Sequence, residues 1–348
     1  MADKHYFHRV NEQTATRFWI NNVTEWQAHK AIEEGAIGCT QNPSYVWKMI
    51  TNPDAKEHVD GIIRKHLSAF ENDNDVLVAV QRELVGEICQ IFLPLYEESD
   101  GKRGYVSIQG DPFHEDVDTI VKCALYNREA APNIMNKVPV TENGLKAIEY
   151  LASKGCPINA TEVMSVRQAL DVVDAYERGT KGMKNKAPIY YSHITGILDQ
   201  YLGINVKENN IEIEKDILWQ AGIAAAKKTY WMTKERNSEV GFIGGGARGL
   251  QHFTEMVGGD VNITINWIGT ADKLIEQDPV VVQRFFQPTP YSVLDELLKK
   301  IPDFRKAYEV DAIKPEEYEE FGPVVLFRKS FEDAWSKALD YIKNMRNN

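Results

Sequence analysis

The chain has 348 residues, of which 43% are hydrophobic, and its 40 lysines and arginines against 51 aspartates and glutamates give a formal net charge of −11. This length allows one large domain or two modest ones with a sizeable core. The negative charge argues against nucleic acid as a partner, although a local cationic pocket for a small anion stays compatible with it.

Cysteine spacing and hydropathy exclude further classes of protein. The four cysteines (Cys39, Cys89, Cys123 and Cys156) lie far apart and form no CxxC pair, so we expect neither a zinc site nor a disulfide framework. The start, MADKHYFHRV, has no apolar stretch behind its charges, which argues against a signal peptide. No apolar run approaches the roughly 18 residues of a membrane span. A soluble cytoplasmic protein without a membrane partner is therefore expected.

Short apolar runs alternate with longer helical patterns along the chain. The predicted strands are residues 17–21, 36–40, 105–109, 133–138, 157–161, 187–194, 240–245 and 261–266. The predicted helices include residues 24–35, 54–72, a segment from Asp75, residues 116–129, 141–155, a segment through Tyr176, and 212–233. Thr24 and Thr141 are candidate N-caps. After Pro279 we expect helix to the end of the chain, apart from PVVLF at 323–327.

This alternation predicts an α/β fold, a closed parallel (β/α)8 TIM barrel with a C-terminal helical extension. An open doubly wound sheet is the alternative, but no GxGxxG motif opens a helix early in the chain. GFIGGGARG at 241–249 is rich in glycine, yet it lacks the Lys-Ser/Thr of a phosphate-binding P-loop. We expect residues 1–280 to form the barrel and residues 281–348 to pack on it within the same domain.

One lysine stands inside an apolar run, NIMNKVPVT at 133–141. Lys137 either snorkels to water at a strand end or is a desolvated amine, whose lowered pKa frees the lone pair to attack a carbonyl. Polar residues at the carboxyl ends of most other strands favour the second interpretation, because these ends meet at one mouth in a barrel. They are Asn21, Thr40, Asn42, Ser107, Gln109, Asn159, Thr161, His193, Arg248 and Thr264.

Two segments of the chain resemble signatures of the transaldolase family, including its fructose-6-phosphate aldolase branch. GCTQNPSYVWKMI (38–50) is similar to the T-x-N-P-[ST] motif of strand two, and NKVPVTENGLKAIEYLASKGCPINAT (136–161) is similar to the lysine motif and the strand after it. The resemblance implies a barrel in which Lys137 forms an imine with a ketose, with no metal or cofactor. It also implies a set of substrate contacts, namely Thr40, Asn42, Ser107, Asn159, Thr161 and, for a phosphate, Arg248.

The chain departs from this pattern where the family carries acid–base groups. The strand-one aspartate falls at Asn21, or alternatively Asn22, and an amide cannot accept the proton of a sugar hydroxyl. The strand-three glutamate falls at Gln109, a change that the aldolase branch shares. A second phosphate arginine falls at Gly196 in a loose alignment. We expect four residues at the catalytic positions: Lys137, the two amides Asn21 and Gln109, and His193, one candidate to replace the missing acid–base groups.

Two replacements for the missing groups are considered. His193 could move protons near neutral pH, or it could be a hydrogen-bonded histidine at a strand end. The basic segment 177–186 could fold over the mouth and bind phosphate, or it could be a solvated surface loop. Residues 331–345 have helical spacing and pack either on the barrel or on a second subunit, so a homo-oligomer is possible.

Two functions stay open at this point. The first is a transaldolase-like class I aldolase that takes a dihydroxyacetone unit from a sugar or sugar phosphate and transfers or releases it. The second is a barrel with little or no catalysis that binds a sugar phosphate or a protein partner, which the amides of Asn21 and Gln109 would suit.

Overall fold

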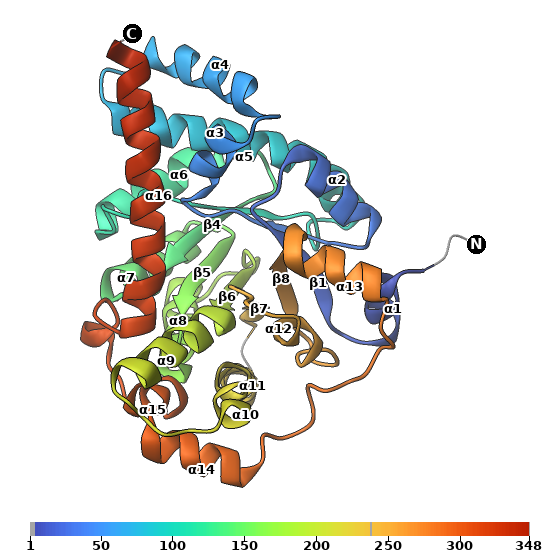
Figure 1. Cartoon of the computed structure of the whole chain (residues 1–348). Coiled ribbons are helices and arrows are strands. Elements are labelled where there is room, and N and C mark those ends of the chain that lie inside the picture. The colour runs from blue at the N-terminus through green and yellow to red at the C-terminus, as the bar shows by residue number, and fades with distance from the viewer. Residues whose placement is uncertain (1–3, 237–238, 348) are drawn as a thin grey trace.

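The strands of this computed structural model, which describes residues 4–236 and 239–347, form a closed parallel barrel in sequential order (Figure 1). They are β1 (Arg17–Asn21), β2 (Cys39–Thr40), β3 (Val106–Gln109), β4 (Ile134–Pro139), β5 (Ile158–Val163), β6 (Ile189–His193), β7 (Gly241–Gly244) and β8 (Asn262–Asn266). β8 pairs with β1 in parallel, from Arg17 beside Asn262 to Asn21 beside Asn266, and this pairing closes the barrel. The predicted (β/α)8 architecture is confirmed.

Helices follow the strands around the barrel. They are α2 (Glu25–Glu33), α3 (Tyr45–Thr51), α4 (Lys56–Leu67), α5 (Asp73–Glu98), α6 (Val117–Arg128), α7 (Glu142–Ser153), α8 (Val166–Gly179), α9 (Thr195–Glu208), α10 (Lys215–Leu218), α11 (Ala221–Glu235), α12 (Gln251–Thr254) and α13 (Asp272–Gln277). The predicted caps are confirmed, since the Thr24 side chain accepts a hydrogen bond from the Gln27 amide and the Thr141 side chain accepts one from the Gly144 amide.

Some predicted elements were wrong in extent or type. The helix predicted for 54–72 ends at Leu67, and the region predicted as one helix at 212–233 is divided between α10 and α11. The helices α1 (Tyr6–Gln13), α3 and α9 were not predicted. PVVLF was excluded from the C-terminal helix, but residues 322–347 form one continuous helix, α16 (Gly322–Asn347). Pro323 is tolerated there because the first helical turn leaves its amide positions without intrahelical partners.

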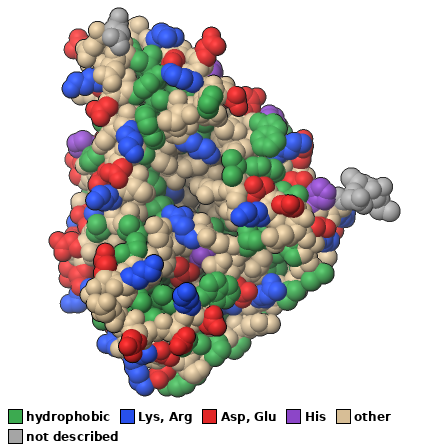
Figure 2. All heavy atoms as spheres, viewed as in Figure 1, with side chains coloured by type: hydrophobic (Ala, Val, Ile, Leu, Met, Phe, Trp, Pro, Cys, Tyr) green, Lys and Arg blue, Asp and Glu red, His purple; other side chains and the backbone are tan. Residues whose placement is uncertain are grey.

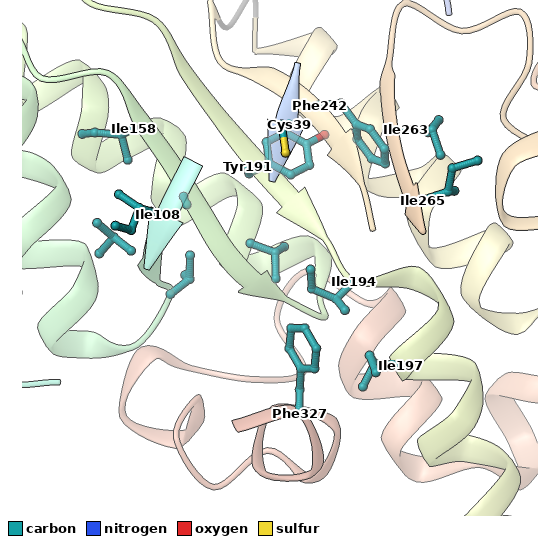
Figure 3. Close-up of a cluster of buried hydrophobic side chains, with 14 of the residues drawn as sticks. Cys39, Ile108, Ile158, Tyr191, Ile194, Ile197, Phe242, Ile263, Ile265 and Phe327 are labelled. Carbon is teal, nitrogen blue, oxygen red and sulfur yellow. The ribbon is translucent and has the colours of Figure 1, made fainter. Parts of the chain in front are cut away.

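Two hydrophobic clusters hold the barrel together. The larger one lies between strands and helices and includes the outward-facing side chains of Ile108, Ile158 and Tyr191, seen in Figure 3. The smaller one consists of Trp19, Tyr105, Met135 and Ile243, which come from alternating positions on four strands or their starts. Because these four side chains point into the barrel, they form an apolar floor beneath its carboxyl-terminal mouth.

The C-terminal segment packs on the barrel through α14 (Tyr291–Lys300), α15 (Pro302–Tyr308) and α16. α16 runs along the barrel and contacts α3, α5, α9 and β5 (Figure 1). The Trp335 indole donates to the Asn74 side chain at 2.8 Å, and Phe327 points towards Ile194 and Ile197 near the end of β6 (Figure 3). None of the described helices is long and apolar enough to cross a membrane.

Candidate active site

Polar side chains from successive strands meet inside the carboxyl-terminal end of the barrel. Because strand residues alternate between its two faces, the lumen receives every second position. Those that form the site are Asn21, Thr40, Ser107, Gln109, Lys137, Asn159, Thr161, Ser192 and Thr264. Hydrogen bonds join them across the lumen: Thr40 Oγ1 donates to Asn21 Oδ1 at 2.9 Å and lies 2.8 Å from Thr264 Oγ1.

A cavity of about 200 Å³ opens above these side chains. Its wall includes Asn21, Asn22, Thr40, Asn42, Ser44, Lys137, Ser192, Arg248, Thr264, Asn266, Phe327, Ser330 and Phe331. The space-filling view shows a hollow near the middle of the molecule with lysine and arginine side chains around it (Figure 2). The cavity is smaller than the roughly 300–1,000 Å³ of sites for drug-sized ligands, so it suits a compact polar molecule.

Lys137 is a residue of β4. Gln109 of β3 lies beside it in register on one side, and Asn159 of β5 lies beside it on the other. The residue is only 7% exposed, and the Phe331 ring of α16 is centred 6.0 Å from its Nζ. Within the described residues Lys137 forms no salt bridge. Burial lowers the pKa of this lysine to about 8, and the nearby Glu162 carboxyl partly opposes that shift.

The lowered pKa changes how much reactive amine is present. At pH 7 about a tenth of Lys137 is neutral, compared with about one in 3,000 for a lysine of ordinary pKa. Asn159, which is beside Lys137 in register, is itself fixed by the Ser192 hydroxyl, which donates to its Oδ1 at 2.7 Å. The site therefore presents a partly neutral amine next to an oriented amide.

Asn21 and Asn22 have different environments. Asn21 accepts from Thr40 and donates from Nδ2 to Asn266 Oδ1 at 2.9 Å, which places its amide among the lumen groups. Asn22 has a left-handed backbone and donates to Asn42 Oδ1 at 3.0 Å, while the Lys48 ammonium donates to its carbonyl. Asn22 therefore holds Asn42 in place, and Asn21 is the residue that occupies the expected strand-one position in the lumen.

Arg248 lies in the loop after β7 and lines the cavity. Its Nε donates to Gln200 Oε1 at 2.6 Å, and burial lowers the pKa of its guanidinium. No second arginine can stand at position 196, because a Cβ on Gly196 would lie 2.1 Å from the Gly246 carbonyl oxygen. Lys137 and Arg248 are the cations among the described residues that line this cavity.

The basic segment 177–186 does not cover the mouth, which agrees with the surface-loop alternative. It joins the end of α8 to the start of β6, so it lies at the amino-terminal end of the barrel. Lys186 forms a salt bridge with Glu239 at 2.7 Å and Arg178 forms one with Glu149 at 2.7 Å. These cations are engaged by surface carboxylates on the side away from the site.

His193 is placed away from the lumen, which does not support its expected role in proton transfer. Its ring stacks on Phe242 with centroids 6.3 Å apart, and Nδ1 lies 3.0 Å from Thr195 Oγ1. Complete burial lowers the pKa of His193 to about 3, so it stays neutral across the physiological range. Ser192, one position earlier, is the β6 residue that faces Asn159.

Glu162 was missed by the sequence analysis, which ended its strand at Thr161. The residue is fully buried and has φ +64° at a register irregularity between Ala160 and Val163 in the β5–β6 pairing. Its Oε1 accepts a hydrogen bond from Gln109 Nε2 at 2.9 Å. Burial raises the pKa of Glu162, while the Gln109 hydrogen bond and Lys137 oppose that rise. An acid directly after the N-A-T run was the available signal.

A second, larger cavity of about 530 Å³ reaches Gln109 and Lys137 from the side of α5 and α6. Glu115, in the segment before α6, lines this cavity and was also missed. Burial and the neighbouring Glu162 hold the pKa of Glu115 well above its ordinary value. No group of three or more residues that could hold a metal ion occurs within residues 4–236 and 239–347.

Comparison with known proteins shows which family the sequence of this chain matches. The family described as "Transaldolase/Fructose-6-phosphate aldolase" matches residues 18–305. The chain is similar to a transaldolase of Thiobacillus denitrificans, with 29% identity over 254 residues that cover 67% of this chain and 68% of the relative. It is 28% identical to a transaldolase of Mycobacterium tuberculosis over 217 residues, covering 58% of this chain and 56% of that one. The match therefore spans little more than half the length of the mycobacterial relative.

Proposed function

Because the chain belongs to the transaldolase/fructose-6-phosphate aldolase family, we propose that it is a class I aldolase or transaldolase acting on a ketose sugar or sugar phosphate. The observation that carries the proposal is Lys137, a buried amine of lowered pKa at the mouth of the barrel. Its register neighbours Gln109 and Asn159 supply polar groups on both sides. Such an amine attacks carbonyl carbon readily because its lone pair is free.

The proposed reaction needs no electron sink beyond the lysine imine. Lys137 Nζ attacks the ketose carbonyl, and the carbinolamine loses water to form an iminium ion. The iminium withdraws electrons from the adjacent carbon–carbon bond, which breaks to release an aldehyde and leave an enamine on Lys137. The enamine then attacks an acceptor aldehyde, or it is protonated and hydrolysed to free dihydroxyacetone.

The other cavity residues would bind and orient the sugar. Asn159 and Ser192 are fixed to each other at 2.7 Å and can hold the carbinolamine hydroxyl. Thr40 and Asn21 present a hydroxyl and an amide to the sugar hydroxyls from the opposite wall. Arg248 is the group suited to a phosphate, because its planar guanidinium can donate two hydrogen bonds to phosphate oxygens.

The second candidate is a barrel that binds a sugar phosphate with little or no catalysis. The observation that favours it is the amide at both Asn21 and Gln109, where the resemblance implies carboxyls for proton transfer. In that case Lys137 would bind the ligand as an ammonium without forming an imine. The two candidates therefore differ in whether a covalent bond to Lys137 forms.

Reductive trapping tests the proposal. The protein is incubated at pH 8 with fructose, fructose 6-phosphate, sedoheptulose 7-phosphate or dihydroxyacetone, and sodium borohydride is added. We expect a mass increase equal to the reduced ketose adduct on the peptide that contains Lys137. Lys137→Met should abolish this adduct. Lys227→Met is the matched control, because Lys227 is also buried but donates to the Arg284 and Gln287 carbonyls outside the site.

Two results would contradict the proposed function. The first is an absence of any adduct with all four ketoses, which favours the binding candidate if one of them still protects the fold against thermal unfolding. The second is an adduct that persists in Lys137→Met, because the reactive amine would then lie elsewhere.

A further inference from the structure

Glu162 combines three costly features in one residue. Its side chain is fully buried, its backbone has φ +64°, and its Oε2 has no hydrogen-bond partner within the described part of the chain. A left-handed backbone strains a residue that has a Cβ, and a buried unpaired polar atom adds to that cost. Such a residue persists only where the surrounding structure fixes it, and this pattern is concentrated at functional sites.

The strained backbone determines where the Glu162 side chain goes. Thr161 and Glu162 stand where the pairing of β5 with β6 shifts by a residue, because Ala160 pairs with Tyr191 and Val163 pairs with His193. A β-bulge of this kind re-aims a side chain relative to the regular alternation. The result is that Glu162 meets Gln109 of β3 at 2.9 Å, although an even position on β5 would otherwise face the helices.

The charged groups around Glu162 come from several elements. Gln109 of β3 donates to it, and Lys137 of β4 is close enough for the two to influence each other's pKa. Arg328 of α16 lowers the pKa of Glu162 and Glu332 of the same helix raises it, while Glu162 raises the pKa of Glu115, in the segment before α6. Arg328 lies 3.9 Å from Glu115, so this cation is shared within the group of carboxyls.

We propose that Glu162 is the acid–base group of this site, exchanging protons with Lys137 and with the bound sugar in place of the carboxyls that positions 21 and 109 lack. The inference rests on the proposed function. Gln109 then has a defined part, since its Nε2 binds the Glu162 carboxyl while Gln109 itself lines the larger cavity together with Lys137. Because Glu162 itself lines neither cavity, its proton reaches Lys137 and the sugar through a water molecule between them.

The Glu162 carboxyl can give the proton that one step needs and take back the proton that the next step releases. When the carbinolamine on Lys137 dehydrates, the Glu162 carboxylic acid gives its proton to the departing hydroxyl, and water and an iminium ion result. When the carbon–carbon bond breaks, the Glu162 carboxylate takes the proton of the sugar hydroxyl as that carbon becomes an aldehyde. The bonding electrons go to the enamine, and the carboxyl is again protonated for hydrolysis of the intermediate.

The test compares Glu162→Gln, Glu162→Gly and Asp171→Asn by aldehyde release from the ketose that traps best on the wild-type protein. Glu162→Gln keeps an acceptor for Gln109 but cannot exchange a proton, and we expect turnover to fall about 100-fold or more. Glu162→Gly relieves the left-handed backbone and opens space, so added formate should restore turnover at least about tenfold. Asp171→Asn is the matched control, because Asp171 is also buried but pairs with Arg167 and Tyr318 away from the cavities, and we expect turnover within about threefold of wild type.

Rescue by formate separates proton exchange from a structural role, because a structural defect does not respond to a small acid. Turnover of Glu162→Gln within about threefold of wild type would overturn the inference, as would a Glu162→Gly protein that folds, traps ketose and ignores formate. If the wild-type protein forms no adduct at Lys137, the proposed function and the inference fall together. If it forms the adduct and the Glu162 variants turn over normally, only the inference falls.

Discussion

Replacing Lys137 with methionine should make the protein more stable at neutral pH, although it removes the proposed nucleophile. Burial lowers the pKa of Lys137 from 10.5 to about 8. At pH 7 Lys137 is mainly charged in both the folded and the unfolded chain. Folding must therefore bury an ammonium, and the full free energy of the pKa shift is lost from the stability of the folded state. At about 1.4 kcal/mol per pKa unit this cost is about 3 kcal/mol. Methionine has a similar unbranched shape and carries no charge to bury.

The pH dependence of this gain follows from the direction of the shift. Between the folded pKa of about 8 and the unfolded pKa of 10.5, the unfolded chain binds more protons at Lys137 than the folded chain does. The wild-type protein therefore recovers the lost free energy of unfolding as pH rises through this window. The advantage of Lys137→Met should shrink from about 3 kcal/mol at pH 7 to about 1 kcal/mol at pH 10.

Urea unfolding of both proteins at pH 7 and pH 10, followed by circular dichroism, measures the two differences. Lys227→Met is the control. It should lower the free energy of unfolding, because the Arg284 and Gln287 carbonyls lose the donor that Lys227 provides. Equal stability of Lys137→Met and wild type at pH 7 would refute the claim that the folded protein bears a buried ammonium at this position. A gain that is the same at both pH values would do so as well.

Three further predictions follow from the same geometry. The rate of borohydride trapping at Lys137 should rise about tenfold per pH unit below pH 8 and level off above it, since the neutral amine reacts; a flat profile from pH 6 to 9 would contradict this. Phe331→Ala should open Lys137 to water, move that midpoint upwards, and lower the free energy of unfolding by about 3–5 kcal/mol; an unmoved midpoint would show that Phe331 does not shield the amine. His193→Phe should keep trapping and turnover within about threefold, because the ring packs on Phe242 outside the lumen; a large loss of turnover with trapping intact would return His193 to the mechanism.

The barrel and the position of Lys137 followed from the sequence because both depend on local patterns. Short apolar runs separated by helical periods predict parallel strands, and the carboxyl ends of such strands meet at one mouth. Lys137 therefore had to lie near Asn159 and Thr40 wherever the exact strand limits fell. The polar contacts expected for the family were likewise identified as a group by their shared place at strand ends.

Side-chain direction at two positions depended on details that the sequence does not encode locally. Ser192 and His193 are adjacent polar residues at the end of β6, and a shift of one residue decides which of them faces the lumen. Glu162 reaches Gln109 only because β5 carries a bulge, which forms through its pairing with β6. PVVLF was left out of the predicted helix. Its valines favour strands over helices, but packing of Phe331 and Trp335 in the same helix overrides that preference.

The C-terminal helix connects the stability of the protein with the chemistry of its site. The family match ends at residue 305, whereas α16 begins at Gly322, so the helix lies outside the matched region. It nevertheless brings Phe331 over the Lys137 amine and Arg328 to the carboxyls near Glu162. The ring that covers Lys137 and a cation that lowers the pKa of Glu162 thus come from a segment outside the matched region.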